Sequence, residues 1–267
     1  MSMPNDLVTM RFDEGVATVE LNDPAKYNAL SRDLVADLQA GLDAVEKSDA
    51  RCVVVRGANG AFSAGGDVQK MKERHERDTI DISAEIRDLE RTTSAVITRL
   101  ATFPLPVVAA IDGPAVGAGA TLALACDVQL ASEDAKIGFS FRNVGLAIDS
   151  ATSYLLPRVV GENVAKELVF TGEIVDADRA LDLGLVNHVY KTDEFSDAVD
   201  EFVDTVASGP TVALVEDKKL IREGLEKSID HAVTDEAMAQ GIALTTADHE
   251  EGVEAFLEGR DPSFSGK

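Results

Sequence analysis

The chain has 267 residues, of which 45% are hydrophobic, so it can bury the core of one large domain, or of a core domain with a smaller appendage. Its 48 acidic and 25 basic residues give a formal net charge of −23, which argues against nucleic acid and anionic membranes as partners because both would be repelled. No run of about 18 apolar residues occurs and the first ten residues lack a signal-peptide pattern, so we expect a cytoplasmic protein. Only 11 of the basic residues are lysine, which favours a high-salt organism.

Apolar strand patterns alternate with helix patterns up to about residue 190. Strands are predicted at residues 16–22, 51–57, 107–112, 128–132 and 185–190. A helix is predicted from its N-cap Ser31 to about Lys47, because apolar residues recur on one face. Further elements are helices at 86–103, 120–126 and most of 151–183, and a turn at 113–119. The charged segment 71–83 has little to bury, and we expect it to be mobile. The alternation predicts an α/β core.

The C-terminal part of the sequence predicts helices only, from residue 192 to about residue 257. We therefore divide the chain into an α/β core at 1–194 and a helical region at 195–267. Several apolar positions of the helical region need a partner surface: Phe202, Val206, Leu214, Leu220, Ile242, Leu244 and Phe256. A second copy of the chain could supply that surface, so we expect the region to drive oligomerisation.

Two glycine-rich turns follow two buried strands, in segments 53–67 and 107–121. The second turn lacks the third glycine of a dinucleotide fingerprint, which argues against a nucleotide-dependent oxidoreductase. The four histidines are scattered without ligand spacing, so no metal site is expected. Each turn leaves backbone N–H groups open where a helix begins, and two such donors aimed at one oxygen would form an oxyanion hole.

Several further segments fit one pattern together with these turns. They are NDPAKYNALS (22–31), AFSAGGDV (61–68), residues 106–132, LLPRVVG (155–161), residues 171–189 and AFLEGRDPSFSGK (255–267). In this order they resemble the enoyl-CoA hydratase/isomerase (crotonase) family over nearly the whole chain. The resemblance implies an α/β fold built as a spiral of β-β-α units, with C-terminal helices that form trimers, often paired into hexamers. It also implies acyl-CoA thioester substrates and no separate cofactor.

The resemblance carries a set of site residues with it. The thioester oxygen would accept hydrogen bonds from the backbone N–H groups of Gly66 and Ala118, which are the two oxyanion-hole donors. Candidates for substrate contacts near the CoA moiety are Ala64, Asp67, Lys26 and Arg260. The two cations would suit the CoA phosphates, although a solvated surface position stays open for both.

The chain departs from the family's hydratases at the catalytic carboxylates. Hydratases of this family use two glutamates, and the matching positions here are Thr121 and Phe141, which cannot exchange protons with water in that way. Asp149 remains, in the mainly apolar stretch 138–158. The isomerases that shift double bonds, or that open the epoxide of ring-activated phenylacetyl-CoA, resemble this chain most closely. Asp149 would then move a proton through a stabilised enolate, with its basicity raised by poor solvation.

Alternatives remain open for Asp149 and for the function. Asp149 could instead cap a helix that begins beside it. Thr121, Phe141 and Tyr154 would contact the acyl group, or Phe141 and Tyr154 would simply fill the core. A dehalogenase is disfavoured because such enzymes pair the aspartate with a tryptophan, and the chain has none. Beside the isomerase, a hydratase with another acid/base arrangement, a dehalogenase-like hydrolase and a non-catalytic acyl-CoA-binding subunit stay possible.

Overall fold

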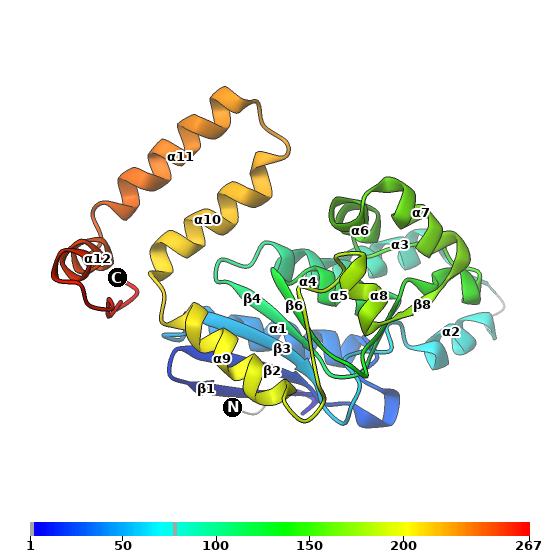
Figure 1. Cartoon of the computed structure of the whole chain (residues 1–267). Helices are drawn as coiled ribbons and strands as arrows, with labels where there is room; N and C mark the ends of the chain where they lie inside the picture. Colours follow the sequence, from blue (N-terminus) through cyan, green and yellow to red (C-terminus); the bar gives the residue numbers. More distant parts are fainter. Residues whose placement is uncertain (1–2, 77–78) are drawn as a thin grey trace.

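A six-stranded sheet forms the centre of the fold in the computed structural model, which describes residues 3–76 and 79–267 (Figure 1). Its strands, in spatial order, are β1 (Val8–Asp13), β2 (Val16–Leu21), β3 (Cys52–Gly57), β4 (Val107–Ile111), β6 (Val128–Ser132) and β9 (His188–Tyr190). β1 pairs antiparallel with β2, and every other neighbouring pair is parallel. The five predicted strands all form, and β1 is a sixth strand that was not predicted.

A second sheet has three short strands: β5 (Pro114–Val116), β7 (Lys136–Gly138) and β8 (Ile174–Asp176). The turn predicted at 113–119 is therefore wrong in part, because residues 114–116 pair in parallel with β7. Ala115 also forms an isolated parallel bridge to Ser63. A three-residue strand is too short to show a periodic pattern in the sequence.

Helices α1 to α4 lie between β2 and β4 in the chain. α1 (Arg32–Val45) begins as predicted, since Ser31 Oγ accepts the N–H of Leu34 at 3.2 Å. The helix predicted at 86–103 is divided at Thr92 into α3 (Ile82–Arg91) and α4 (Thr93–Ala101). The charged segment 71–83 is partly helical, because it includes the end of α2 (Val68–His75) and the start of α3; residues 77 and 78 lie outside the described residues.

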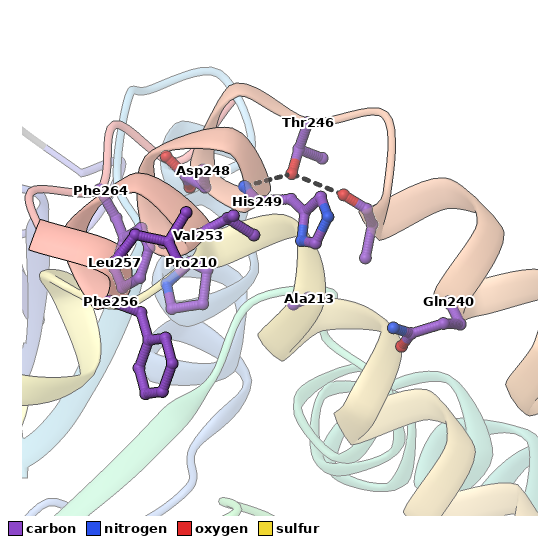
Figure 2. A pocket seen from close by; sticks show the side chains of 12 residues that line it. Pro210, Ala213, Gln240, Thr246, Asp248, His249, Val253, Phe256, Leu257 and Phe264 are labelled. Atoms are coloured by element: carbon purple, nitrogen blue, oxygen red, sulfur yellow. Dashed lines mark hydrogen bonds between the residues drawn. The ribbon is translucent and has the colours of Figure 1, made fainter.

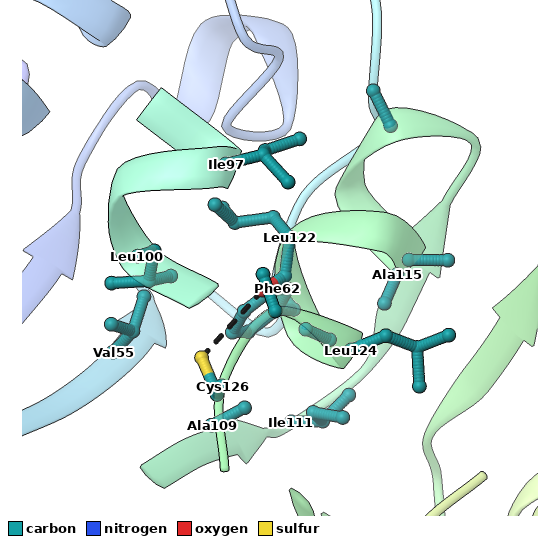
Figure 3. Close-up of a cluster of buried hydrophobic side chains, with 14 of the residues drawn as sticks. Val55, Phe62, Ile97, Leu100, Ala109, Ile111, Ala115, Leu122, Leu124 and Cys126 are labelled. Atoms are coloured by element: carbon teal, nitrogen blue, oxygen red, sulfur yellow. Dashed lines mark hydrogen bonds between the residues drawn. The ribbon is translucent and has the colours of Figure 1, made fainter. Parts of the chain in front are cut away.

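Helix α5 (Ala118–Leu124) lies inside the core, and all seven of its residues are buried. Leu122 belongs to one buried cluster with Phe62, Ile97 and Leu100 (Figure 3). A helix that is apolar on every side is stable only where other elements surround it. The first turn of α5 is therefore held in place by packing on all sides.

The remaining elements complete the core on its second half. They are η1 (Pro24–Lys26), η2 (Ser140–Val144), α6 (Thr152–Val160), α7 (Glu162–Thr171) and α8 (Ala177–Asp182). The mainly helical region predicted at 151–183 is thus confirmed, apart from the strand β8 within it.

The C-terminal helices divide into one that packs on the sheet and three that extend from it. α9 (Phe195–Ala207) buries its apolar face against β2, β3, β4 and β6. α10 (Thr211–Gly224), α11 (Ile229–Ala243) and α12 (Ala247–Glu258) reach away from the sheet (Figure 1). Their exposed large apolar side chains include Ile221, Leu225, Ile229, Met238, Phe256 and Leu257. No helix within residues 3–76 and 79–267 is long and apolar enough to cross a membrane.

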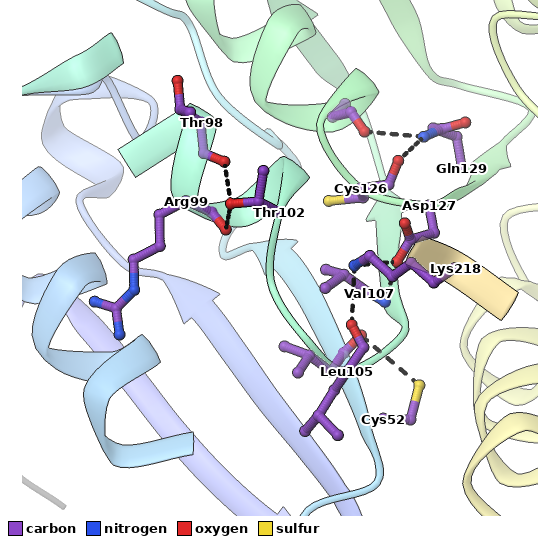
Figure 4. Close-up of polar contacts among 12 residues, drawn as sticks. Cys52, Thr98, Arg99, Thr102, Leu105, Val107, Cys126, Asp127, Gln129 and Lys218 are labelled. Carbon is purple, nitrogen blue, oxygen red and sulfur yellow. Dashed lines mark hydrogen bonds and ion pairs between the residues drawn. The ribbon is translucent and has the colours of Figure 1, made fainter. Parts of the chain in front are cut away.

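One partly buried ion pair ties α10 to the core (Figure 4). Lys218 Nζ lies 2.7 Å from Asp127 Oδ2 and donates to the carbonyl oxygen of Leu105 at 3.0 Å. The same Asp127 oxygen accepts the N–H of Val107 at 2.8 Å, at the start of β4. Burial raises the pKa of Asp127, while the Lys218 charge opposes this rise. Removing the lysine would leave this half-buried carboxylate without its countercharge.

We expect Lys218→Ala to lower the free energy of unfolding by about 2 kcal/mol, because the partly buried Asp127 loses its countercharge and keeps only the hydrogen bond from Val107. Urea unfolding of the variant against the wild type measures this change. The adjacent exposed Lys219 provides the matched control, and Lys219→Ala should change stability by less than about 0.5 kcal/mol. Equal effects of the two substitutions would contradict a structural role for the Lys218 pair.

Candidate active site

A cavity of about 540 Å³ lies where the two glycine-rich turns meet α3 and the segment 140–149. Six of the residues predicted for the site line it: Ala64, Gly66, Asp67, Ala118, Phe141 and Asp149. These residues come from distant parts of the chain, and the fold brings them to one place. The cavity is therefore the candidate active site.

The first turn is fixed by hydrogen bonds from the segment that follows β2. Ser63 Oγ donates to the carbonyl oxygen of Asn28 at 2.7 Å and accepts the N–H of Gly65 at 3.2 Å. Leu30 donates its N–H to the Gly65 carbonyl oxygen at 2.7 Å, and Ala64 donates to the Tyr27 carbonyl oxygen at 2.9 Å. These bonds occupy the N–H groups of Ala64 and Gly65. The Gly66 N–H donates to no acceptor among the described residues.

The two turns are in direct backbone contact. Ser63 donates to the Pro114 carbonyl oxygen at 3.0 Å, and Val116 donates back to the Ser63 carbonyl oxygen at 2.9 Å. A Cβ atom at Gly65, where φ is +82°, would lie 2.3 Å from the Val116 carbonyl oxygen. A Cβ atom at Gly119 would lie 2.4 Å from the Ser63 carbonyl oxygen. Only glycine fits at both positions.

This contact places two backbone donors on one cavity. Ala118 is the first residue of α5, so its N–H has no acceptor within the helix. Gly66 lines the same cavity from the first turn. Two unpaired N–H groups at a helix start and in a neighbouring turn are suited to stabilise negative charge on a carbonyl oxygen.

Asp149 lines the cavity as a half-buried carboxylate. Its Oδ1 atom is buried and has no hydrogen-bond partner among the described residues. Burial raises the pKa of Asp149, and the neighbouring Ser150 hydroxyl offsets part of the rise. A raised pKa makes a carboxylate a stronger base, which suits a proton-transfer group.

The structure excludes the helix-cap alternative for Asp149. α6 begins at Thr152, and its N-cap residue is Ala151, which makes no side-chain capping bond. Asp149 approaches the helix only through its main chain, because its carbonyl oxygen accepts the Thr152 N–H at 2.9 Å. The side chain is left free toward the cavity.

The other two carboxylates among the described lining residues are already engaged. Asp67 lies 2.9 Å from Lys26 Nζ and accepts the N–H of Gln69 at 3.0 Å. Asp88 on α3 pairs with Arg32 at 2.5 Å. Of the three, only Asp149 combines burial with a free oxygen.

The described lining also has many large apolar side chains, and η2 with the segment after it contributes four of them. The large apolar side chains are Leu30, Val68, Met71, Leu89, Val116, Phe141, Val144, Leu146 and Ile148. Phe141 is buried on η2, where a hydratase would carry a glutamate according to the resemblance. The cavity can hold an apolar acyl group beside the two N–H donors.

Four predicted site residues lie outside the cavity lining. Lys26 contacts it only through its ion pair with Asp67. Thr121 is completely buried behind it, and Tyr154 is 41% exposed with its hydroxyl donating to Glu226 at 2.7 Å. Arg260 is paired with Glu251 at 2.6 Å and with Glu258 at 2.7 Å at the end of α12. Within this chain, none of the four reaches the cavity.

Two cations of the site were not predicted from the sequence. Arg32 and Lys70 both line the cavity. Each lies close to a residue that was predicted: Arg32 comes directly after the predicted N-cap Ser31, and Lys70 lies three residues after the predicted site residue Asp67. Adjacency to these features was the available signal, but only the fold shows that α1 and α2 begin at the same cavity.

A second cavity, of about 550 Å³, lies among α10, α11, α12 and the C-terminal tail (Figure 2). Its buried carboxylate is Asp248, which accepts N–H groups of Ser265 at 2.6 Å and Gly266 at 2.9 Å. The cavity therefore has a carboxylate that already binds the tail, and it lacks a free one. Within residues 3–76 and 79–267 no group of three or more potential ligand side chains could hold a metal ion.

Comparisons with known proteins place the chain in one family. The family described as Enoyl-CoA hydratase/isomerase matches residues 11–267. The 1,2-epoxyphenylacetyl-CoA isomerase of Escherichia coli is 33% identical over 263 residues, which cover 98% of this chain and 99% of that protein. The crotonyl-CoA hydratase of Syntrophomonas wolfei is 31% identical over an alignment of 268 residues, which covers 99% of this chain and 100% of that protein.

Solved structures agree with this placement. The crystal structure of an enoyl-CoA hydratase from Bacillus anthracis matches with a TM-score of 0.90 and 29% identity, covering 98% of this chain and all of that one. An enoyl-CoA hydratase/isomerase from Cupriavidus metallidurans matches with a TM-score of 0.91 and 29% identity, covering all of this chain and 98% of that one. The predicted α/β crotonase fold with C-terminal helices is confirmed, and the structure shows that its strands form two sheets. Members of the family generally work without a cofactor. The chain belongs to the enoyl-CoA hydratase/isomerase (crotonase) family and is an acyl-CoA enzyme.

Proposed function

We propose that the protein is an acyl-CoA isomerase in which Asp149 is the single proton-transfer base. One observation carries this proposal: Asp149 is the only carboxylate of the described cavity lining with a buried, unpartnered oxygen. The two positions that match the hydratase glutamates hold Thr121, which lies outside the lining, and Phe141, which cannot transfer protons. One free carboxylate favours a reaction in which a single group removes and returns a proton.

The proposed reaction moves the double bond of a 3-enoyl-CoA to the 2-enoyl position. Asp149 takes a proton from C2, and the electrons of that C–H bond pass into the thioester carbonyl to give a dienolate. The N–H groups of Gly66 and Ala118 hydrogen-bond the developing oxyanion, each contributing about 3–4 kcal/mol by analogy with other oxyanion holes. Asp149 then returns the proton to C4, which regenerates the carboxylate. No water is consumed.

The apolar lining and the named relatives widen the substrate class. The Escherichia coli relative is a 1,2-epoxyphenylacetyl-CoA isomerase, and an epoxide of an aromatic acyl-CoA would use the same stabilised thioester oxygen. Phe141 and the neighbouring aliphatic side chains offer an apolar surface for either acyl group. We propose that Lys26 and Arg260 bind the CoA phosphates. In this chain they would first have to leave their carboxylate partners.

We also propose that residues 195–267 mediate a homotrimer, or a dimer of trimers. The exposed apolar side chains of α10 to α12 support this, because such surface is costly to leave in water. α9 stays with the core in either case, since it packs on the central sheet.

Asp149→Asn is expected to lower kcat for 3-enoyl-CoA isomerisation by about 1,000-fold or more, because the amide cannot accept the proton. Coupled or direct absorbance assays with a 3-enoyl-CoA measure this. Asp88→Asn is the comparison variant on the same cavity, and it should lower kcat far less because Asp88 is already paired with Arg32. Hydration of a 2-enoyl-CoA that survives Asp149→Asn would contradict the mechanism. Binding of acyl-CoA without any turnover would instead indicate a non-catalytic binding subunit.

The raised pKa of Asp149 predicts the pH dependence of both activity and stability. Activity should be lost as pH falls through that pKa, with a midpoint above the ordinary value of 3.8, because only the ionised carboxylate is a base.

For stability the sign is opposite: a raised pKa of Asp149 in the folded state penalises folding once the group ionises. Asp149→Asn should therefore stabilise the protein at pH 7 and lose this advantage near pH 3.8. Activity profiles and thermal unfolding at both pH values check the two signs.

Ala118→Pro is expected to lower kcat by about 100-fold or more, because proline has no N–H to donate to the oxyanion. Proline is tolerated at the first position of a helix, so α5 should still form. Ala118→Gly keeps the N–H and is the matched control. A Pro variant that folds and keeps wild-type kcat would show that the Ala118 N–H does not stabilise the transition state.

A further inference from the structure

Two threonines behind the cavity connect Asp149 to the oxyanion turn. Thr121 lies on α5 and Thr152 is the first residue of α6, and both are completely buried. Their hydroxyl oxygens are 2.6 Å apart. Neither residue belongs to the cavity lining, so neither hydroxyl is placed to contact a substrate.

The direction of the hydrogen bonds follows from their acceptors. Each threonine hydroxyl carries a single hydrogen. The Thr152 hydroxyl donates to the carbonyl oxygen of Asp149 at 2.7 Å. The hydrogen between the two hydroxyls is therefore that of Thr121, whose other neighbour, the Gly117 carbonyl oxygen, is more distant at 3.3 Å. The bonds form a chain from Thr121 through Thr152 to the main chain of Asp149.

The turn that bears Asp149 needs such support. Ser150 and Ala151 have φ angles of 52° and 66°, in the left-handed region that residues with side chains disfavour. α6 has no side-chain cap, and Asp149 Oδ1 has no partner. The turn is held through the Asp149 carbonyl oxygen, which accepts both the N–H and the hydroxyl of Thr152.

A catalytic carboxylate must keep a raised pKa to act as a base, and it must also be held in a fixed position; these two requirements conflict. Hydrogen bonds to the carboxylate would fix its position, but they would stabilise its charge and lower its pKa. Bonds to the main chain of the same residue fix its position without that effect. Thr121, at the far end of this chain of hydrogen bonds, lies on α5 one turn after Ala118. The hydrogen bonds therefore connect the main chain of Asp149 to the helix that carries an oxyanion donor.

We propose that Thr121 and Thr152 are positioning residues that set the Asp149 carboxylate relative to the Ala118 N–H. This inference rests on the proposed function, in which Asp149 is the base. It also assigns a task to Thr121, which stands where the family resemblance puts a hydratase glutamate.

Thr121→Val and Thr152→Val test the proposal, because valine keeps the shape of threonine and removes the hydroxyl. Each should lower kcat for 3-enoyl-CoA about 10- to 100-fold with KM within about threefold, as expected for a displacement of a reacting group. Thr121→Ser and Thr152→Ser restore the hydroxyl and should return kcat to within about threefold of the wild type. The kcat of the double valine variant should lie within about threefold of the kcat of the slower single variant, because both substitutions break the same chain of hydrogen bonds.

Thr211→Val is the matched control for the loss of a buried threonine hydroxyl. Thr211 Oγ1 accepts from Arg51 Nε at 2.8 Å, at the start of α10 and outside the cavity lining. We expect it to lower the melting temperature and to leave kcat at the wild-type value. Valine variants at 121 or 152 that resemble this control, losing stability but keeping kcat, would overturn the positioning role.

The experiment separates this inference from the proposed function. If the wild type does not isomerise 3-enoyl-CoA, or if Asp149→Asn keeps the activity, then the proposed function fails and the inference fails with it. If both behave as expected while Thr121→Val and Thr152→Val keep wild-type kcat, only the positioning role is wrong. A fall in kcat without rescue by either serine variant also contradicts it.

Discussion

The backbone contact between the two glycine-rich turns is the constraint on which the site depends. At Gly65 and Gly119 the space for a side chain is occupied by the carbonyl oxygens of Val116 and Ser63. Each turn therefore lies against the main chain of the other, with no side chain between them. Gly66 and Ala118 line one cavity because their turns are this close. A pair of donors defined by main chain alone keeps its geometry better than one carried on flexible side chains.

The surrounding core explains how such a contact is maintained. β3 and β4 are neighbouring parallel strands, so the segments that follow them leave the same edge of the sheet. The bridge between Ser63 and Ala115 then extends their pairing beyond the sheet. α5 begins directly after this bridge and is buried on every side, which fixes the Ala118 end. Ordinary strand pairing and helix burial thus determine where the two N–H groups lie.

Local patterns carried enough information to predict most of the fold. Strands such as β3 and β4 are continuous apolar runs between turn residues, and Ser31 marks the start of α1 by its capping chemistry. β1 was missed because its exposed, partly charged residues give a weak pattern on an edge strand. β5 was missed because three residues pair only through contacts with β7, far along the chain.

The candidate site was predictable to the extent that its chemistry is local. The glycine turns and Asp149 were found from residue type and from resemblance, and the structure brings them to one cavity. The isolation of Asp149 Oδ1 was not predictable, because it depends on which groups fail to reach it in three dimensions. The hydroxyl pair was missed for the same reason, since Thr121 and Thr152 become neighbours only when α5 and α6 pack. Arg260 was predicted from the resemblance as a contact for the CoA phosphates. In the structure its guanidinium already pairs with Glu251 and Glu258, which the sequence pattern did not reveal.

The position of Thr121 connects the proposed chemistry to the stability of the site. A glutamate there would supply a second acid/base group, which the addition of water requires, but an uncompensated buried charge would be costly to fold. A threonine hydroxyl is uncharged and carries a single hydrogen to place, and the Thr152 hydroxyl oxygen accepts it at 2.6 Å. An isomerase regenerates its base when the proton returns to the substrate, so it needs no second carboxylate. In the proposed isomerase, the buried side chain at position 121 supports the site instead of transferring protons. Asp149, whose Oδ1 atom has no hydrogen-bond partner among the described residues, acts as the base.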